Sequence, residues 1–211
     1  MKKLLLVGLV AFTMSCSNEN SKSEYHSAPV AVAFFKGTLD GQAVDFRQDG
    51  SLTPAYFFNF AHSFDQLYVI DYGCYLYPSQ SQTGHPELGM YFDNMYNNPE
   101  TTNEPSVFYT TFGNPLPTNF LTSVQEDAHV KGIEVTYTDE NGKSYSSLYG
   151  SQTGSTMTVT SSVSGIEKGT SHKIQTIIGA VNCKVYNDQD PTDFKTITNG
   201  EYKLVYRQYV D

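Results

Sequence analysis

The feature that most constrains the fold is a strict alternation of apolar and polar residues late in the chain. Residues 133–138 have the sequence Ile-Glu-Val-Thr-Tyr-Thr. Successive side chains of a β-strand point to opposite faces, so this pattern predicts a strand with one buried and one solvated face. Residues 139–142 (Asp-Glu-Asn-Gly) are typical of a tight turn, and residues 143–148 are then expected to pair back as a hairpin.

The same organisation extends over residues 30–211, which we expect to form a single domain. Short runs rich in Val, Ile, Tyr, Phe and Thr are separated by turn residues, and no strand–helix–strand alternation interrupts them. We therefore predict an all-β fold, an antiparallel β-sandwich of about ten to twelve strands, with a closed β-barrel as the alternative. The strands are expected near residues 30–39, 43–48, 56–62, 67–77, 88–96, 107–112, 133–138, 143–148, 157–159, 174–186, 194–197 and 202–206.

Three local features refine this prediction. Asp40-Gly41 and Asn199-Gly200 are dipeptides that tolerate positive φ, so each is expected to form a hairpin turn. The apolar pattern changes parity near Gly179-Ala180, which predicts a β-bulge. The apolar spacing in residues 119–129 permits one short helix, with Asn119 as its cap.

The N-terminus has the composition of an export signal. Lys2 and Lys3 precede an uncharged apolar run, residues 4–14, which is too short to span a bilayer as a helix. The run ends at Ser15-Cys16, and this arrangement resembles the lipobox of bacterial lipoproteins. The resemblance implies that residues 1–15 are a signal peptide, cut off before Cys16, and that Cys16 carries a diacylglycerol and a third acyl chain. The alternative is an ordinary secretory signal that contains a cysteine.

Residues 16–29 then comprise the lipidated cysteine and a polar, flexible tether to the domain. Two or more acyl chains anchor a protein stably. We therefore expect an exported protein that is lipid-anchored at the outer membrane. The domain, for example its run at residues 132–143, resembles the small single-domain β-sandwich lipoproteins of Gram-negative bacteria, and that resemblance carries no catalytic residues with it.

The net charge limits the classes of partner. The formal charge is −9 at pH 7, whereas binding to nucleic acid requires a basic patch on the protein. An acidic chain also does not favour docking flat on an anionic leaflet. We expect contact with a membrane through the N-terminal lipid, no nucleic-acid partner and no cofactor.

The sequence does not determine whether the two remaining cysteines pair with each other. Cys74 and Cys183 each share a strand face with apolar neighbours, so both are expected in the core. In an oxidising compartment they either pair as a disulfide or remain two buried free thiols.

One acidic segment is a weak candidate for a metal site. Asp188, Asp190 and Asp193 could supply oxygen ligands to calcium, but the segment lacks the glycine and distal glutamate of an EF-hand loop. The alternative is a solvated turn between strands. The five histidines have no metal-ligand spacing, so we expect no metal.

Aromatic residues give the one candidate ligand surface. Tyr91 and Tyr96, beside Asp93 and Asn94, could present rings next to polar groups to a glycan or a protein partner. The alternative is that Tyr and Phe, 29 residues in all, fill the core between two sheets.

The function expected from the sequence is a non-enzymatic binding or structural module at the cell envelope. No nucleophile motif or phosphate-binding glycine loop is present. Two alternatives remain open: a hydrolase whose carboxylates come from distant strands, and a β-barrel carrier of a small apolar ligand.

Overall fold

Most of the residues that the structure describes lie in β-strands. The computed structural model describes residues 31–49, 57–64, 67–78, 86–97, 112, 115–124, 130–166, 171 and 173–207. Its ten strands are β1 (Ala31–Leu39), β2 (Gln42–Asp49), β3 (Phe57–Phe64), β4 (Leu67–Pro78), β5 (Glu87–Asn97), β6 (Gly132–Thr138), β7 (Ser144–Ser146), β8 (Thr156–Ile166), β9 (Lys173–Asn187) and β10 (Phe194–Arg207). A 3₁₀ turn, η2 (Ser147–Tyr149), follows β7. The predicted all-β class is confirmed.

All ten strands belong to one antiparallel sheet whose pairing returns to its start. The order is β10-β1-β2-β4-β5-β6-β7-β9, and β9 also pairs with β10. Strand β8 adds to β9, and β3 adds to β4. The ring is narrowest at β2–β4 and at β7–β9, where only two residue pairs join each pair of strands.

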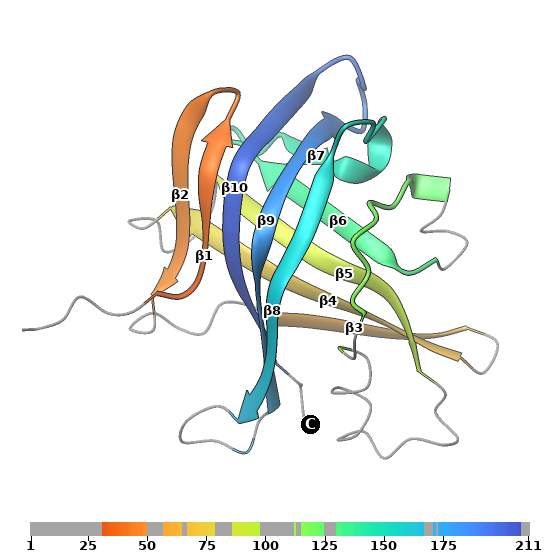
Figure 1. Ribbon diagram of the computed structural model, residues 1–211. Helices are drawn as coiled ribbons and strands as arrows, with labels where there is room; N and C mark the ends of the chain where they lie inside the picture. Colours follow the sequence, from red (N-terminus) through yellow and green to blue (C-terminus); the bar gives the residue numbers. More distant parts are fainter. Residues whose placement is uncertain are drawn as a thin grey trace, which may run out of the picture.

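Figure 1 shows these strands in two layers. Strands β2, β1, β10, β9 and β8 form the front layer, and β3 to β6 cross behind them. Side chains from both layers meet in one core: Phe92 of β5 and Tyr206 of β10 pack edge to face with ring centroids 5.5 Å apart. Tyr206 also donates a hydrogen bond across the core to the carbonyl of Met90 (3.3 Å). The arrangement thus combines facing layers with a ring of paired strands.

The two predicted hairpin dipeptides have different outcomes. Asp40 (φ 50°) and Gly41 (φ 79°) form the tight β1–β2 turn, as predicted. Asn199-Gly200 does not form a turn, because β10 runs through it without interruption. Asn199 takes its positive φ (52°) in a β-bulge, where the β9–β10 register shifts between Ile197 and Gly200.

The predicted bulge lies on the neighbouring strand, and the predicted helix is reduced to a short piece within the described residues. The register between β8 and β9 does shift opposite Gly179, but the extra residue is Thr160 on β8. The chain is not helical at residues 119–121, because Leu121 N–H and Ile133 N–H donate to the carbonyls of Ile133 and Asn119, respectively. Residues 123–124 are helical and residues 125–129 lie outside the described residues, as do 107–111 of another predicted strand. In the part of the chain that the structure describes, no helix is long and apolar enough to cross a membrane.

Candidate ligand-binding site

The outer face of the back layer carries the most site-like group of side chains. In residues 72–76 of β4, 88–92 of β5 and 133–137 of β6 every second side chain is buried in the core, and the residues between them point outward. The β4–β5 register places Tyr75 opposite Gly89 and Gly73 opposite Tyr91, and the β5–β6 register places Tyr91 opposite Glu134. Three strands therefore bring tyrosines, glycines and a carboxylate together on one face.

Two glycines allow the tyrosine rings to lie against this face. A β-carbon on Gly73 would lie 2.6 Å from Cε1 of Tyr91, and one on Gly89 would lie 2.9 Å from Cε2 of the same ring. A β-carbon on Gly89 would also lie 3.1 Å from Tyr75 Cε1. Real Cβ atoms essentially never approach other atoms closer than 3.0 Å, so any larger residue at either position would displace the Tyr91 ring.

Tyr75 and Tyr91 hold each other in place. Their rings meet edge to face, with centroids 5.5 Å apart and planes at 88°. Their hydroxyl groups share a hydrogen bond, and Thr136 bonds to that of Tyr91. Burial raises the pKa of both phenols, and the carboxylate of Glu134 raises each further. Both therefore remain neutral at physiological pH.

Carboxylates of the same face are oriented by hydroxyls on the next strand. Ser146 of β7 donates a hydrogen bond to Oε1 of Glu134 (2.6 Å). Thr138 of β6 donates to Oε1 of Glu87 (3.4 Å). A hydroxyl of the neighbouring strand therefore contacts each of the two glutamates.

These side chains line a hollow of about 260 Å³, which we call the tyrosine hollow. Its lining consists of four tyrosines, three carboxylates and four hydroxyl residues: Tyr75, Tyr91, Tyr145, Tyr149, Glu87, Glu134, Asp188, Thr136, Thr138, Ser144 and Ser146. A second hollow of about 390 Å³ shares Tyr149 and Asp188 with it. The Tyr149 side chain, 41 % exposed, therefore stands between two adjoining depressions.

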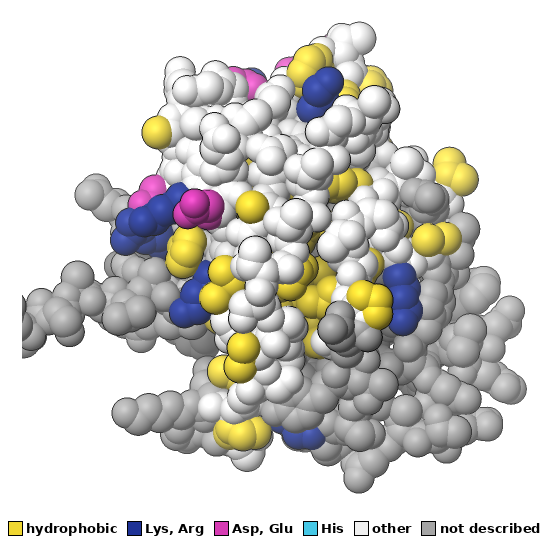
Figure 2. Space-filling view, viewed as in Figure 1, with side chains coloured by type: hydrophobic (Ala, Val, Ile, Leu, Met, Phe, Trp, Pro, Cys, Tyr) yellow, Lys and Arg dark blue, Asp and Glu magenta, His cyan; other side chains and the backbone are white. Residues whose placement is uncertain are grey.

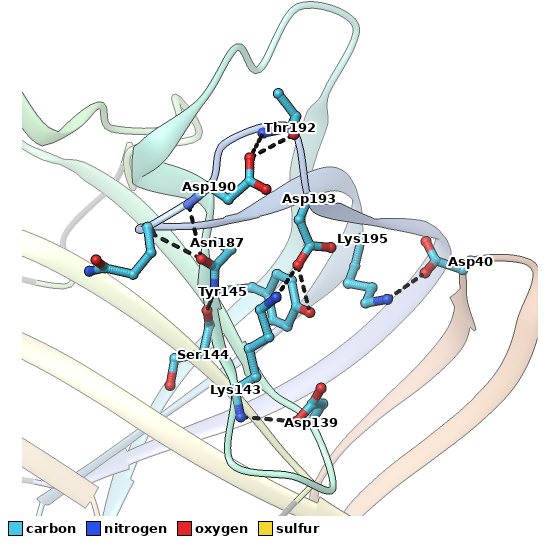
Figure 3. Close-up of polar contacts among 11 residues, drawn as sticks. Asp40, Asp139, Lys143, Ser144, Tyr145, Asn187, Asp190, Thr192, Asp193 and Lys195 are labelled. Carbon is cyan, nitrogen blue, oxygen red and sulfur yellow. Dashed lines mark hydrogen bonds and ion pairs between the residues drawn. The ribbon is translucent and has the colours of Figure 1, made fainter.

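The acidic segment after β9 is a turn whose carboxylates bond to neighbours (Figure 3). Asp190 accepts hydrogen bonds from the N–H (3.0 Å) and hydroxyl (2.6 Å) of Thr192. Asp193 accepts a short bond from Lys143 Nζ and one from the Tyr145 hydroxyl (3.3 Å). Within the described residues, no group of three or more His, Cys, Asp or Glu could hold a metal ion. Of the three aspartates, Asp188 alone lines the tyrosine hollow.

The two cysteines are buried, as predicted, and are not bonded to each other. Cys74 and Cys183 are free thiols, so the structure contains the second of the two alternatives. Burial raises the pKa of each thiol to about 12.

Of the other residues that the sequence predicts for a ligand surface or a lipid anchor, the structure places one in the hollow and does not describe the rest. Tyr91 lies in the tyrosine hollow. Cys16 lies outside the described residues, and so do the side chains of Asp93, Asn94 and Tyr96.

Sequence reasoning did not identify nine of the eleven lining residues, among them Tyr75, Glu87, Glu134 and Tyr149. A usable signal was present in the two Gly-x-Tyr triplets at 73–75 and 89–91, which place a glycine and a tyrosine on the same strand face. Reading that signal requires the register between the two strands.

The opposite side of the molecule, the front layer, has a different character. Figure 2 shows apolar side chains gathered over its middle, with lysines and arginines toward its margins. Val163 of β8 (57 % exposed) and Ile178 of β9 (38 %) are two exposed apolar residues of these strands. Comparison of the chain with protein-family models, with curated proteins and with solved structures found no match.

Proposed function

We propose that this protein is an exported lipoprotein, anchored through Cys16, which binds a glycan in the tyrosine hollow without transforming it. The observation that carries the binding role is the construction of the hollow. Two glycines make room for the rings of Tyr75 and Tyr91, and hydroxyls and carboxylates surround them. Sugars offer apolar C–H faces and many hydroxyls, so rings beside hydrogen-bonding groups match their chemistry.

The backbone spacing of the two glutamates bears on the hydrolase alternative. Glu87 pairs with Thr138, and Glu134 pairs with Tyr91, so the backbones of the two glutamates lie four residues apart along the strands, about 13 Å. Glycosidases hold their two carboxyl groups about 5 to 9.5 Å apart, so these side chains would have to lean toward each other to act as such a pair.

The core favours binding over carriage of an apolar ligand. Among the described residues, large side chains from both layers fill the space inside the ring, including Phe35, Phe92, Tyr202 and Tyr206. A carrier would instead need an apolar cavity.

A glycan array probed with the full chain in neutral detergent tests the binding role. We expect a defined set of glycans to bind, and the Tyr91→Ala variant to lose about tenfold in affinity. Phe34→Ala, on the outer side of the front layer, is the matched aromatic control and should bind normally. Loss of the bound glycans during incubation, with release of reducing sugar, would favour the hydrolase instead. An array with no bound glycan would refute the proposal.

The anchor is tested separately from the ligand. Cells grown with radiolabelled palmitate should label the wild-type chain, and the Cys16→Ala variant should carry no label. A labelled variant, or an unlabelled wild type, would contradict the lipid anchor and leave the binding role untouched.

A further inference from the structure

Strand β8 is paired along one edge only. It pairs with β9 from Thr156 to Ile166, and among the described residues no other strand pairs with its second edge. Figure 1 shows β8 at the margin of the front layer. An unpaired edge presents a row of backbone N–H and C=O groups, which proteins usually block with charged residues, proline or a bulge. Apart from one bulge, at Thr160, β8 has none of these: it contains no proline and no charged residue.

A groove of about 560 Å³ runs along this second edge of β8. Ser161 lies opposite Ile178, which is exposed, and Ser162 lies opposite Ile177, which is buried. The two serines therefore point to different faces of the sheet, yet both line the groove. A hollow that touches side chains of both faces lies along the edge of the strand, where the backbone is accessible.

The far wall of the groove does not pair with β8. Phe112, Pro115, Leu116 and Thr118 form this wall. Proline has no N–H to donate, and Pro117 is a second proline in the same segment. Within the described part of the chain, residues 115–118 make no backbone hydrogen bond to β8. The segment therefore lies beside the strand and leaves a space between them.

Side chains and carbonyls of β9 hold this edge in place. Gln175, only 2 % exposed, donates a hydrogen bond to the Ser162 hydroxyl (2.7 Å) and accepts one from the Ser164 hydroxyl (2.7 Å). The hydroxyl of Thr160 donates to the carbonyl of Ile178 (3.1 Å). The strand is thus fixed before a partner arrives, so that little binding energy is lost in ordering it.

We propose that this groove binds an extended peptide segment of a partner protein, which adds to β8 as a further strand. The groove shares no lining residue with the tyrosine hollow, so this site is separate from the proposed glycan site. Strand addition at a free edge is a recurrent mode of peptide recognition: the ladder gives affinity, and contacts of alternate side chains give specificity. Residues 159–164 span about 17 Å, the length of about six residues of an added strand.

The lining of the groove defines the chemistry of the segment. None of the described residues that line it is charged, whereas the whole chain has a formal charge of −9. An acidic segment would be repelled by the chain as a whole, and a basic one would find no carboxylate in the groove. Alternate side chains of the added strand would face Phe112 and Leu116. We therefore expect an uncharged segment with an apolar residue at every second position.

The wall favours a single segment over a second copy of the chain. A second copy that paired its own β8 with this edge would bring a whole sheet to the groove. Its β9 would follow at the next strand position and would meet the wall formed by residues 115–118. A single peptide segment has no such neighbour.

Uncharged heptapeptides provide the test. The probes are five acetylated and amidated peptides in which Thr alternates with Val, Ile, Leu, Phe or Tyr, and each has a copy that is N-methylated at its three central amides. The copy keeps every side chain but cannot donate these three hydrogen bonds to β8. Titration calorimetry of the full chain in neutral detergent should show saturable binding of at least one probe, and at least about tenfold weaker binding of its N-methylated copy. The bound probe should also slow amide hydrogen exchange in β8.

Matched variants locate the binding. Thr118→Arg places a large charged side chain in the wall of the groove and should weaken probe binding at least about tenfold. Thr158→Arg adds the same side chain on β8 outside the groove and should bind the probe normally. Both threonines are exposed, so both variants should fold, which circular dichroism checks. An equal loss in the two variants would mean that the probe does not bind in the groove, and would overturn the proposal.

Three further outcomes would overturn the proposal. Binding of none of the five probes, or equal affinity for a probe and its N-methylated copy, would mean that no strand is added to β8. A dimer in analytical ultracentrifugation that Thr118→Arg dissociates would mean that a second copy occupies the edge. None of these results bears on glycan binding in the tyrosine hollow, which shares no residue with the groove.

Discussion

The ring of Tyr91 lies directly over Gly73 of the neighbouring strand, so close that a β-carbon on Gly73 would lie only 2.6 Å from the ring. The two residues are paired across the β4–β5 ladder. Their contact determines where the ring lies, and it therefore links the choice of glycine in one strand to the shape of the surface on the next.

Gly73→Ala should weaken ligand binding at a moderate cost in stability. The methyl group would push aside the Tyr91 ring, whose Cε1 and Cδ1 atoms would lie 2.6 and 2.8 Å from it, and leave the backbone in place, so we expect the free energy of unfolding to fall by about 1 to 3 kcal/mol. The displaced ring should lower glycan affinity about fivefold to tenfold. Binding assays and urea denaturation on the same preparation measure both quantities.

Gly165→Ala on β8 is the control for this variant, since the atoms nearest to its β-carbon are 3.6 and 3.8 Å away on Ile174, ordinary contact distances. Wild-type affinity in Gly73→Ala would contradict the importance of the ring position.

Gly179→Ala should destabilise the fold strongly. A β-carbon there would lie 1.9 Å from the carbonyl oxygen of Thr158, a backbone atom, and 2.4 Å from the Tyr202 hydroxyl. Tyr202 donates a hydrogen bond to that same carbonyl (2.9 Å), so the substitution would disturb three elements at once. We expect a loss of about 3 kcal/mol or more in denaturant unfolding, against about 0.5 kcal/mol or less for Gly165→Ala. Similar stabilities in the two variants would contradict this packing.

The alternation of residues predicted the strands well, because burial on one face leaves a direct trace in the sequence. Ile133 and Val135 are fully buried and Glu134 between them points outward, as expected. Asn199-Gly200 shows the limit of local patterns: a positive φ suits both a turn and a bulge, and only the pairing of β10 with β9 decides between them. The predicted helix failed at Asn119 for a similar reason, because a bridge to β6 takes its hydrogen bonds.

The tyrosine hollow could be predicted only in part. Tyr91 was identified as a ligand candidate from its polar neighbours. Its actual companions, Tyr75 and Glu134, come from strands that are far from it in sequence. Their position depends on the register of two ladders, and a shift of one residue would turn them into the core.

Asp193→Asn should make stability less dependent on pH in the acid range. Bonding to Lys143 lowers the pKa of the Asp193 carboxyl below its usual value of 3.8. A carboxyl with a lower pKa in the folded state stabilises the fold above its unfolded pKa, and this contribution is lost as the pH falls through the folded pKa. The wild type should therefore melt above the variant at pH 7, and the two melting curves should converge at a pH well below 3.8.

The neighbouring turn provides a control for this effect. Glu140→Gln removes an exposed carboxylate between β6 and β7, and its melting difference from the wild type should be small at both pH values. A constant difference between wild type and Asp193→Asn across the acid range would show that the aspartate acts by shape and not by charge.

The thiols of Cys74 and Cys183 should be inert in the folded chain. With a pKa of about 12, only about one thiol in 10⁴ is ionised at pH 8, and the thiolate is the reactive form. Native protein should therefore react with a disulfide reagent such as Ellman's only as fast as it unfolds. In guanidinium chloride, without reductant, both thiols should react at once.

The number of thiols that react after unfolding tests the cysteine state and the anchor together. Two thiols in the chain from native membranes are expected, because acylation of the Cys16 sulfur removes the third. Three would mean that Cys16 is unmodified and the core cysteines are free. None would mean that Cys74 and Cys183 form a disulfide, contrary to the free thiols in the structure. One would mean the same disulfide with an unmodified Cys16. Mass spectrometry of the N-terminal peptide distinguishes an acylated Cys16 from one that was removed with the signal.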